Sequence, residues 1–250
     1  MLDERKLAEY IKSLKLPAFA QRYKELAQEA QSSQWTHEEY LFHLLEHEVS
    51  QREENRIRNL IHHAKFPLKK TLDTFNFEQL PELNRTKVLA LSRGQFMGDK
   101  ENVILAGNSG TGKTHLAIAL GICACQKGAR VGFHTAAGLV NELLEMESDK
   151  KLTRFHKQLQ RYDLIIVDEL GYIPFNRKAA ELLFNCFSAR YERGSVIITT
   201  NLEFSEWNKV FGDEKMTAAL LDRVTHNAHI LLMNGESFRL KQTMKRQQVS

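Results

Sequence analysis

A glycine-rich octapeptide that directly follows a short apolar run constrains the fold of this chain more than any other feature. Residues 103–106 read Val-Ile-Leu-Ala, residues 107–114 read Gly-Asn-Ser-Gly-Thr-Gly-Lys-Thr, and a helical pattern continues from 115 to 126. The octapeptide fits Gly-x-x-x-x-Gly-Lys-Ser/Thr, a phosphate-binding loop between a buried strand and a helix. Its glycines let backbone N–H groups point at phosphate oxygens, at a helix end whose dipole favours negative charge. The segment therefore predicts an α/β domain that binds a nucleoside triphosphate.

The loop and the residue after it are the predicted nucleotide contacts. These residues are Gly107, Asn108, Ser109, Gly110, Thr111, Gly112, Lys113, Thr114 and His115. We expect the Lys113 ammonium to reach the β- and γ-phosphates, where it also serves catalysis, and the Thr114 hydroxyl to be a ligand of Mg²⁺. ATP and Mg²⁺ are therefore the expected cofactors.

A second apolar run, Leu-Ile-Ile-Val at residues 164–167, ends in two carboxylates. Asp168, at the carboxyl end of a buried strand, is placed to hold Mg²⁺ through water. Glu169 could polarise a water molecule for attack on the γ-phosphate. The alternative role, capping of a following helix, is weaker because Gly171 and Pro174 leave no helix start nearby. The pair therefore favours ATP hydrolysis over phosphate binding alone.

Three further residues are candidates for contacts with the reacting phosphate. Asn201 follows the β-rich run at 195–200, and a strand order of 5-1-4-3-2 would bring it within reach of the attacking water. Arg223 lies at the end of a helical stretch, and Arg239 follows the last strand. Arginine stabilises the charge that develops on a transferring phosphoryl group, from the same subunit or a neighbour. A turn asparagine and surface ion pairs are the ordinary alternatives.

The apolar pattern changes near residue 67. The first 70 residues contain no glycine and carry apolar residues at helical spacing, and Thr36 with Glu39 forms a capping box for a long helix that Pro67 is expected to stop. Five β-rich runs then alternate with helical stretches, at 103–106, 130–135, 164–167, 195–200 and 229–233. We predict a small all-helical domain at residues 1–67 and a three-layer α/β domain at 68–250, with a five-stranded parallel sheet of order 5-1-4-3-2.

Positive charge is concentrated rather than spread over the chain. The net charge is only +4, but residues 150–161 hold five cations and no carboxylate, and a second such cluster follows residue 237. Four of the first group are spaced to share one face of a helix, namely Lys150, Arg154, Lys157 and Arg161. We predict that these four bind DNA phosphates, with a solvated helix face as the alternative.

Nothing in the sequence indicates a membrane protein or an exported one. No apolar run approaches the roughly 18 residues that span a bilayer. The amino terminus is too charged for a signal peptide. We therefore expect a soluble, cytoplasmic protein with no membrane partner.

Together these motifs resemble the AAA+ ATPases over nearly the whole chain, specifically the clade of the DnaC helicase loader and the IstB insertion-sequence helper. Phe-Asn-Phe at residues 75–77 resembles the Phe-Asp-Phe element that cradles adenine in that clade, which implies nucleotide contacts for Phe75 and Phe77. Residues 168–171 look like the Walker B stretch, and residues 198–201 look like sensor 1 with Asn201 at its end.

Two further blocks are similar to arginine-bearing elements of the clade. Residues 222–226 match the block that carries the trans arginine finger, which implies this role for Arg223. Ser-Phe-Arg at residues 237–239 is similar to the family's Ser-Tyr-Arg, which implies the sensor 2 role for Arg239. Only eleven residues follow Arg239, so we expect the helical lid of AAA+ proteins to be reduced or absent.

The amino-terminal region is similar to IstB proteins in particular, through Leu-Lys-Leu-Pro-Ala-Phe at 14–19 and Ala-Lys-Phe-Pro at 64–67. The resemblance implies an ATP-dependent transposition helper that forms a homo-oligomer on target duplex DNA with little sequence preference. It implies DNA-stimulated ATP hydrolysis and recruitment and stimulation of a cognate transposase. A replicative helicase loader of the DnaC type shares every catalytic residue and is the alternative. A third interpretation, an ATP-gated DNA scaffold with negligible turnover, is disfavoured by Glu169.

Overall fold

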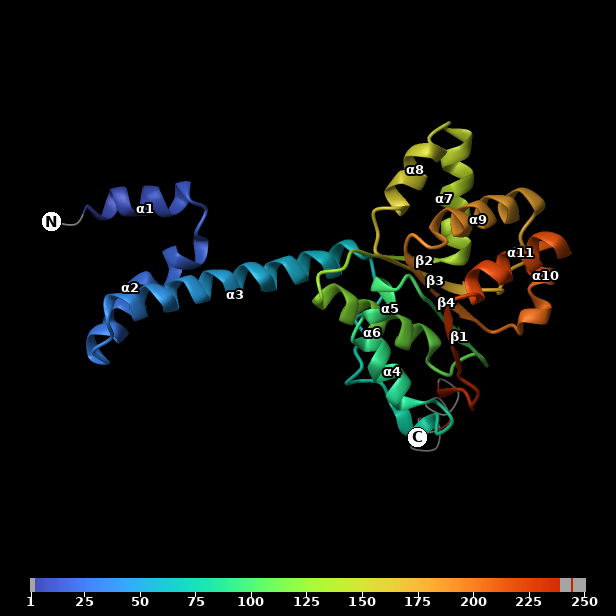
Figure 1. Ribbon diagram of the computed structural model, residues 1–250, viewed down its shortest axis with the longest axis horizontal. Helices are drawn as coiled ribbons and strands as arrows, with labels where there is room; N and C mark the ends of the chain where they lie inside the picture. The colour runs from blue at the N-terminus through green and yellow to red at the C-terminus, as the bar shows by residue number, and fades with distance from the viewer. Residues whose placement is uncertain (1–2, 239–243, 245–250) are drawn as a thin grey trace. The chain divides into compact units, whose positions relative to one another are not determined.

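Three helices form an N-terminal unit that spans residues 1–59, and the rest of the chain forms a second unit, residues 60–250. The structure, a computed structural model, describes residues 3–238 and residue 244 (Figure 1). Arg239 and the cations beyond it therefore lie outside the described residues. No helix in the described part of the chain has the length and apolar character needed to cross a membrane.

The helices of the N-terminal unit begin where the sequence provides capping groups. They are α1 (Glu4–Ser13), α2 (Pro17–Ser32) and α3 (His37–His63), the last of which continues into the second unit. The predicted capping box forms at the start of α3: the Thr36 N–H donates to the Glu39 carboxylate at 2.7 Å, and the Glu39 N–H donates to the Thr36 hydroxyl at 3.2 Å. The helix ends at His63, before Pro67, and Lys65 takes a left-handed φ of 58°.

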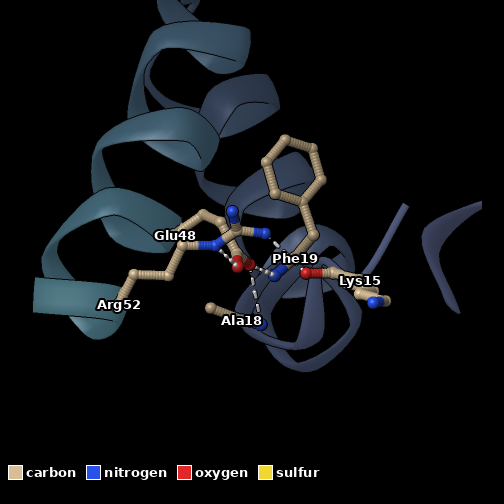
Figure 2. Close-up of polar contacts among 5 residues, drawn as sticks. All are labelled: Lys15, Ala18, Phe19, Glu48 and Arg52. Atoms are coloured by element: carbon tan, nitrogen blue, oxygen red, sulfur yellow. Dashed lines mark hydrogen bonds and ion pairs between the residues drawn. The ribbon is translucent and has the colours of Figure 1, made fainter. Parts of the chain in front are cut away.

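A buried carboxylate joins α2 to α3 (Figure 2). Glu48 accepts hydrogen bonds from the backbone N–H groups of Ala18 at 2.9 Å and Phe19 at 3.2 Å, in the first turn of α2 where such groups have no partner within the helix. Arg52 donates to the Glu48 carboxylate at 2.8 Å and to the Lys15 carbonyl at 2.5 Å. Burial acts to raise the pKa of Glu48, but these donors together outweigh it and hold the pKa below its ordinary value.

The second unit is built on five parallel strands. They are β1 (Asn102–Ala106), β2 (Val131–Thr135), β3 (Leu164–Leu170), β4 (Ser195–Thr200) and β5 (Ala228–Leu232). Their order is β2-β3-β4-β1-β5, which confirms the predicted order 5-1-4-3-2 read from the other edge. β1, β3 and β4 are buried along almost their whole length, as strands covered by helices on both faces must be.

Helices cover both faces of this sheet (Figure 1). On one face lie α4 (Arg85–Ser92), α5 (Gln95–Gly98) and α6 (Lys113–Gln126). On the other lie α7 (Ala136–Ser148), α8 (Leu152–Leu159), α9 (Arg177–Arg190), α10 (Asn208–Phe211) and α11 (Glu214–Thr225). Successive strand residues alternate between the two cores, as Val103 and Leu105 on one side and Ile104 on the other illustrate.

The segment that follows Asn59 packs with the α/β unit. Leu60, Ile61 and Phe66 contact the core under α6, and the Ala64 carbonyl accepts a hydrogen bond from the Phe133 N–H on β2. Packing therefore divides the chain between Asn59 and Leu60. The functional division at residue 67 stays a prediction.

Candidate nucleotide site

The phosphate-binding loop connects β1 to α6, as the motif predicts. Gly107 has φ 148°, and a Cβ atom there would lie 2.3 Å from the Met233 carbonyl oxygen, so only glycine fits. Gly112 caps the start of α6 in a left-handed conformation with φ 93°. No described side chain caps α6, so its first N–H groups face the loop and can bind an anion.

The Lys113 ammonium lies over the loop. It donates hydrogen bonds to the backbone carbonyls of Gly107 at 2.7 Å and Asn108 at 2.6 Å. Both acceptors are neutral, whereas a phosphate oxygen is charged and binds an ammonium about twice as strongly. A phosphate in the loop can therefore take over this ammonium from the two carbonyls.

Asp168 and Thr114 are brought together, as predicted for a magnesium site. Asp168 is only 3% exposed, and the Thr114 hydroxyl donates to its carboxylate at 2.9 Å. A hydroxyl and a carboxylate are the hard oxygen donors that Mg²⁺ takes from proteins. The residues present therefore fit Mg²⁺, with Thr114 and Asp168 as the groups that would hold it.

A β-bulge separates the environments of the two carboxylates. Val167 on β3 pairs with Ile198 on β4, and Leu170 pairs with Thr200, so Asp168 and Glu169 together oppose Thr199. Bulges of this kind redirect side chains and are frequent next to active sites. Asp168 is thereby buried, while Glu169 is exposed and lines a cavity at the loop.

Glu169 takes an unusual backbone conformation. Its φ of 61° lies in the left-handed region, which costs a non-glycine residue about 1–3 kcal/mol. The Glu169 N–H donates to the Thr199 hydroxyl at 2.9 Å, and that hydroxyl donates to Asp168 at 2.6 Å. Thr199 was not among the predicted site residues. The available signal was a pair of threonines at the end of a buried strand, directly before Asn201.

A cavity of about 350 Å³ lies beside the loop, a size typical of small-molecule sites. Its walls include loop residues 109–114, Phe75, His115, Glu169 and Asn201. The structure therefore brings the predicted loop, the predicted base and the predicted water-positioning asparagine to one space.

Aromatic rings form one wall of this cavity. The Phe75 ring meets the His115 ring edge-on at 5.2 Å and the Phe77 ring at 4.9 Å. Phe77 starts a short 3₁₀ turn, Phe77–Gln79, and its ring lies behind Phe75 under the Arg85 guanidinium rather than on the cavity wall. Burial lowers the pKa of His115, whose Nε2 lies 2.9 Å from the Thr71 carbonyl oxygen.

Arg223 does not line the cavity of its own chain. The Arg223 guanidinium lies over the Phe184 ring at 4.9 Å and donates to the Ser188 hydroxyl on α9. Arg239 lies outside the described residues, although Phe238, which precedes it, lines the cavity. A role for Arg223 at a neighbouring subunit's phosphate stays a prediction.

The prediction of one helix through all four DNA-binding candidates was wrong. Lys150 has a left-handed φ of 55° in the turn before α8, and α8 ends at Leu159, before Arg161. Arg154 and Lys157 alone are helical. All four side chains are exposed, and none forms an ion pair with another described residue. The apolar side of α8 packs against the domain, because Phe155 and Leu159 are buried in the core beside β3.

The sheet order, the phosphate loop after β1 and the carboxylates on β3 define a P-loop protein of the AAA+ class. Solved structures show the same fold. The AMPPCP-bound DnaA of Aquifex aeolicus matches with a TM-score of 0.57 and 19% identity, over 74% of this chain and 57% of that one. The DnaC helicase loader matches with a TM-score of 0.55 and 21% identity, over 65% of this chain and 96% of that one.

The family is shown by the sequence comparisons. A family model described as IstB-like ATP binding protein matches residues 9–246. A protein of Geobacillus stearothermophilus, named as an ATP-binding protein of insertion sequence IS5376, is 35% identical over 95% of this chain and 94% of its own length. The corresponding protein named for IS21 in Pseudomonas aeruginosa is 37% identical over 93% of this chain and 88% of its own. The chain belongs to the IstB-like ATP-binding proteins, which confirms the predicted resemblance.

Proposed function

We propose that this protein is an ATP-dependent helper of DNA transposition. It assembles as a homo-oligomer on target duplex DNA with little sequence preference, hydrolyses ATP, and recruits and stimulates its cognate transposase in the cytoplasm. The observation that carries the ATPase part is that the two adjacent carboxylates at the end of β3 have different surroundings. There the buried Asp168 bonds to Thr114, while the neighbouring Glu169 is turned into the cavity.

The chain's own groups perform most of the proposed reaction. The first N–H groups of α6 and the Lys113 ammonium bind the β- and γ-phosphates. Bound Mg²⁺ neutralises the charge that develops on the phosphate oxygens. The Glu169 carboxylate accepts a proton from the attacking water, and the Asn201 amide orients that water. Phe75 provides the apolar surface for the base.

The arginine that completes the site comes from a second subunit in this proposal. Arg223 is half-buried on α11, away from its own cavity, so one chain cannot supply it to its own phosphate in the arrangement seen. An arginine delivered by a neighbour makes turnover depend on assembly. Assembly on DNA is therefore expected to stimulate hydrolysis.

The DNA and transposition parts of the proposal have separate support. The four predicted cations around α8 are exposed and have no ion-pair partner among the described residues, which suits them to phosphate contacts; they are Lys150, Arg154, Lys157 and Arg161. The relatives that cover nearly the whole chain carry insertion-sequence names, whereas the likeness to the DnaC helicase loader is one of fold. This difference favours a transposition helper over a replicative helicase loader.

A steady-state phosphate-release assay tests the proposal, with and without duplex DNA. We expect Mg²⁺-dependent turnover that rises on addition of DNA and is absent in Lys113→Ala. Absence of turnover in every condition would instead support an ATP-gated scaffold. A pull-down with a transposase of the matching insertion-sequence family and with the replicative helicase as separate baits decides the partner. Capture by the helicase alone would reassign the protein as a loader.

A further inference from the structure

We propose that Thr199 is a positioning residue that holds both carboxylates of the nucleotide site with one hydroxyl group. Through Asp168 it sets the affinity for Mg²⁺, and through Glu169 it sets the rate of water activation. The inference rests on the proposed ATPase function. Thr199 borders the cavity, but its hydroxyl is turned to Asp168 and to the Glu169 N–H, and it acts through these two residues.

The Thr199 hydroxyl bridges its two neighbours. It donates its single proton to Asp168 Oδ1 at 2.6 Å and accepts the Glu169 N–H at 2.9 Å. Thr199 is 1% exposed, so no bulk water can substitute for the hydroxyl. A hydroxyl is the smallest side-chain group that both donates and accepts, which is what a bridge between a carboxylate and an N–H requires.

The bulge explains why the bridge is needed at Glu169. In a regular ladder the N–H of each strand residue bonds to a carbonyl of a neighbouring strand, but a bulge disrupts that pattern locally. With two β3 residues facing one β4 residue, the Glu169 N–H bonds to a side chain instead. This bond holds Glu169 at its left-handed φ of 61°, and therefore holds its carboxylate in the cavity.

The same hydroxyl fixes the rotation of the Asp168 carboxylate. Thr114 donates to both carboxylate oxygens, at 2.9 and 3.1 Å, from the α6 side, and Thr199 donates to Oδ1 from β4. When the Thr114 hydroxyl turns toward a cation, Thr199 is the donor that remains. Partners of this kind, which hydrogen-bond a metal-binding carboxylate, typically change metal affinity or activity 10–100-fold when removed.

The first test measures binding without turnover. The affinity for a fluorescent ATP analogue is compared with and without Mg²⁺ in the wild type, Thr199→Val and Thr199→Ser. We expect Thr199→Val to reduce the gain in affinity that Mg²⁺ provides by about 10–100-fold and to leave the Mg²⁺-free affinity unchanged. Thr199→Ser keeps the hydroxyl and should restore the gain. Should Thr199→Val fail to fold, Thr199→Ala removes the same hydroxyl with a smaller side chain.

The second test separates the two carboxylates. In Thr199→Val we expect kcat to fall at saturating Mg²⁺. In a Glu169→Gln background, which is expected to lack turnover, the same substitution should still reduce the gain in affinity that Mg²⁺ provides. Thr217→Val is the matched control. Thr217 is also buried, and its hydroxyl donates a hydrogen bond of 2.7 Å to the Asp213 carbonyl, which is not part of the nucleotide site. This control should leave both measurements at wild-type values.

The outcomes distinguish this inference from the proposed function. A wild-type protein that never hydrolyses ATP would contradict the proposed ATPase, and the Mg²⁺ gain would still decide the role of Thr199 at Asp168. Wild-type Mg²⁺ gain and kcat in Thr199→Val would overturn the positioning role while leaving the ATPase intact. An equal decrease in Thr199→Ser and Thr199→Val would also overturn it, because the hydroxyl would then be irrelevant.

Discussion

The Thr114 hydroxyl donates a hydrogen bond of 2.9 Å to the buried carboxylate of Asp168, although 54 residues separate the two in the chain. Thr114 lies in the first turn of α6, which follows β1 through the loop, and Asp168 lies on β3; β4 separates these two strands in the sheet. The carboxyl ends of parallel strands meet at one edge of the sheet, so the loop after β1 and the end of β3 face each other across β4. The fold itself therefore brings the proposed metal-binding groups together.

Glu169→Gln should retain nucleotide binding and lose turnover. The amide is similar in size to the carboxylate but cannot accept the proton of the attacking water. Phosphate release and binding of a fluorescent ATP analogue, measured on the same preparation, check this. Glu192→Gln is the matched control, since Glu192 is an exposed glutamate with a left-handed φ of 58° that lies elsewhere in the unit. Wild-type turnover in Glu169→Gln would exclude Glu169 as the base.

Arg223→Ala should leave ATP binding by the isolated subunit nearly intact and reduce turnover of the assembled form by about 10³-fold or more. The reason is that its guanidinium would act at a neighbour's γ-phosphate. Phosphate release is measured across mixtures of Arg223→Ala and Lys113→Ala subunits. Some mixed interfaces pair an intact phosphate loop with an intact arginine, so activity should partly recover. If no ratio restores activity, the arginine does not act between subunits.

A double variant, Lys157→Ala combined with Arg161→Ala, should bind all DNA duplexes more weakly and to about the same extent, because phosphate contacts carry no sequence information. The log–log salt dependence of DNA affinity should become shallower by roughly 0.9 for each DNA phosphate that a subunit no longer binds. Affinities at several salt concentrations give this slope.

The control for this pair is Arg177→Ala with Lys209→Ala, which changes the net charge equally. Both of these cations already pair with glutamates, at 3.1 and 2.8 Å. If the two double variants lose DNA affinity to the same extent, the cations around α8 do not form a specific DNA surface.

Acid should destabilise the N-terminal unit through Glu48. The pKa of Glu48 is lower in the folded chain than in the unfolded chain, where it is about 4.3. The contribution of Glu48 to the free energy of unfolding is therefore complete above this unfolded pKa, and it is lost as the pH falls through the lower pKa of the folded chain. Glu48→Gln should lower the free energy of unfolding by about 1.5–3 kcal/mol at neutral pH, and this difference from the wild type should shrink below about pH 4.3.

Denaturant unfolding followed by Trp35 fluorescence in a Trp207→Phe background measures this in the full chain, because Trp35 and Trp207 are its two tryptophans. A deficit that stays constant down to about pH 3 would show that the Glu48 carboxylate does not act through its charge.

Local patterns predicted much of this site, and contacts between distant segments account for what they missed. The phosphate loop is contiguous, so its spacing sufficed to place Lys113 and Thr114. The bulge at Asp168 and Glu169 depends on how β3 aligns with β4, so no pattern within β3 reveals it. The start of α8 likewise depends on the turn that joins it to α7, where Lys150 leaves helical geometry.

ATP is expected to control the assembly of this protein on duplex DNA, and sizing the complex by sedimentation in each nucleotide state tests this most directly. We predict a large protein–DNA complex with ATP that persists in Glu169→Gln, and only small species with ADP or without nucleotide. The same distribution of sizes in ATP, in ADP and without nucleotide would contradict the account.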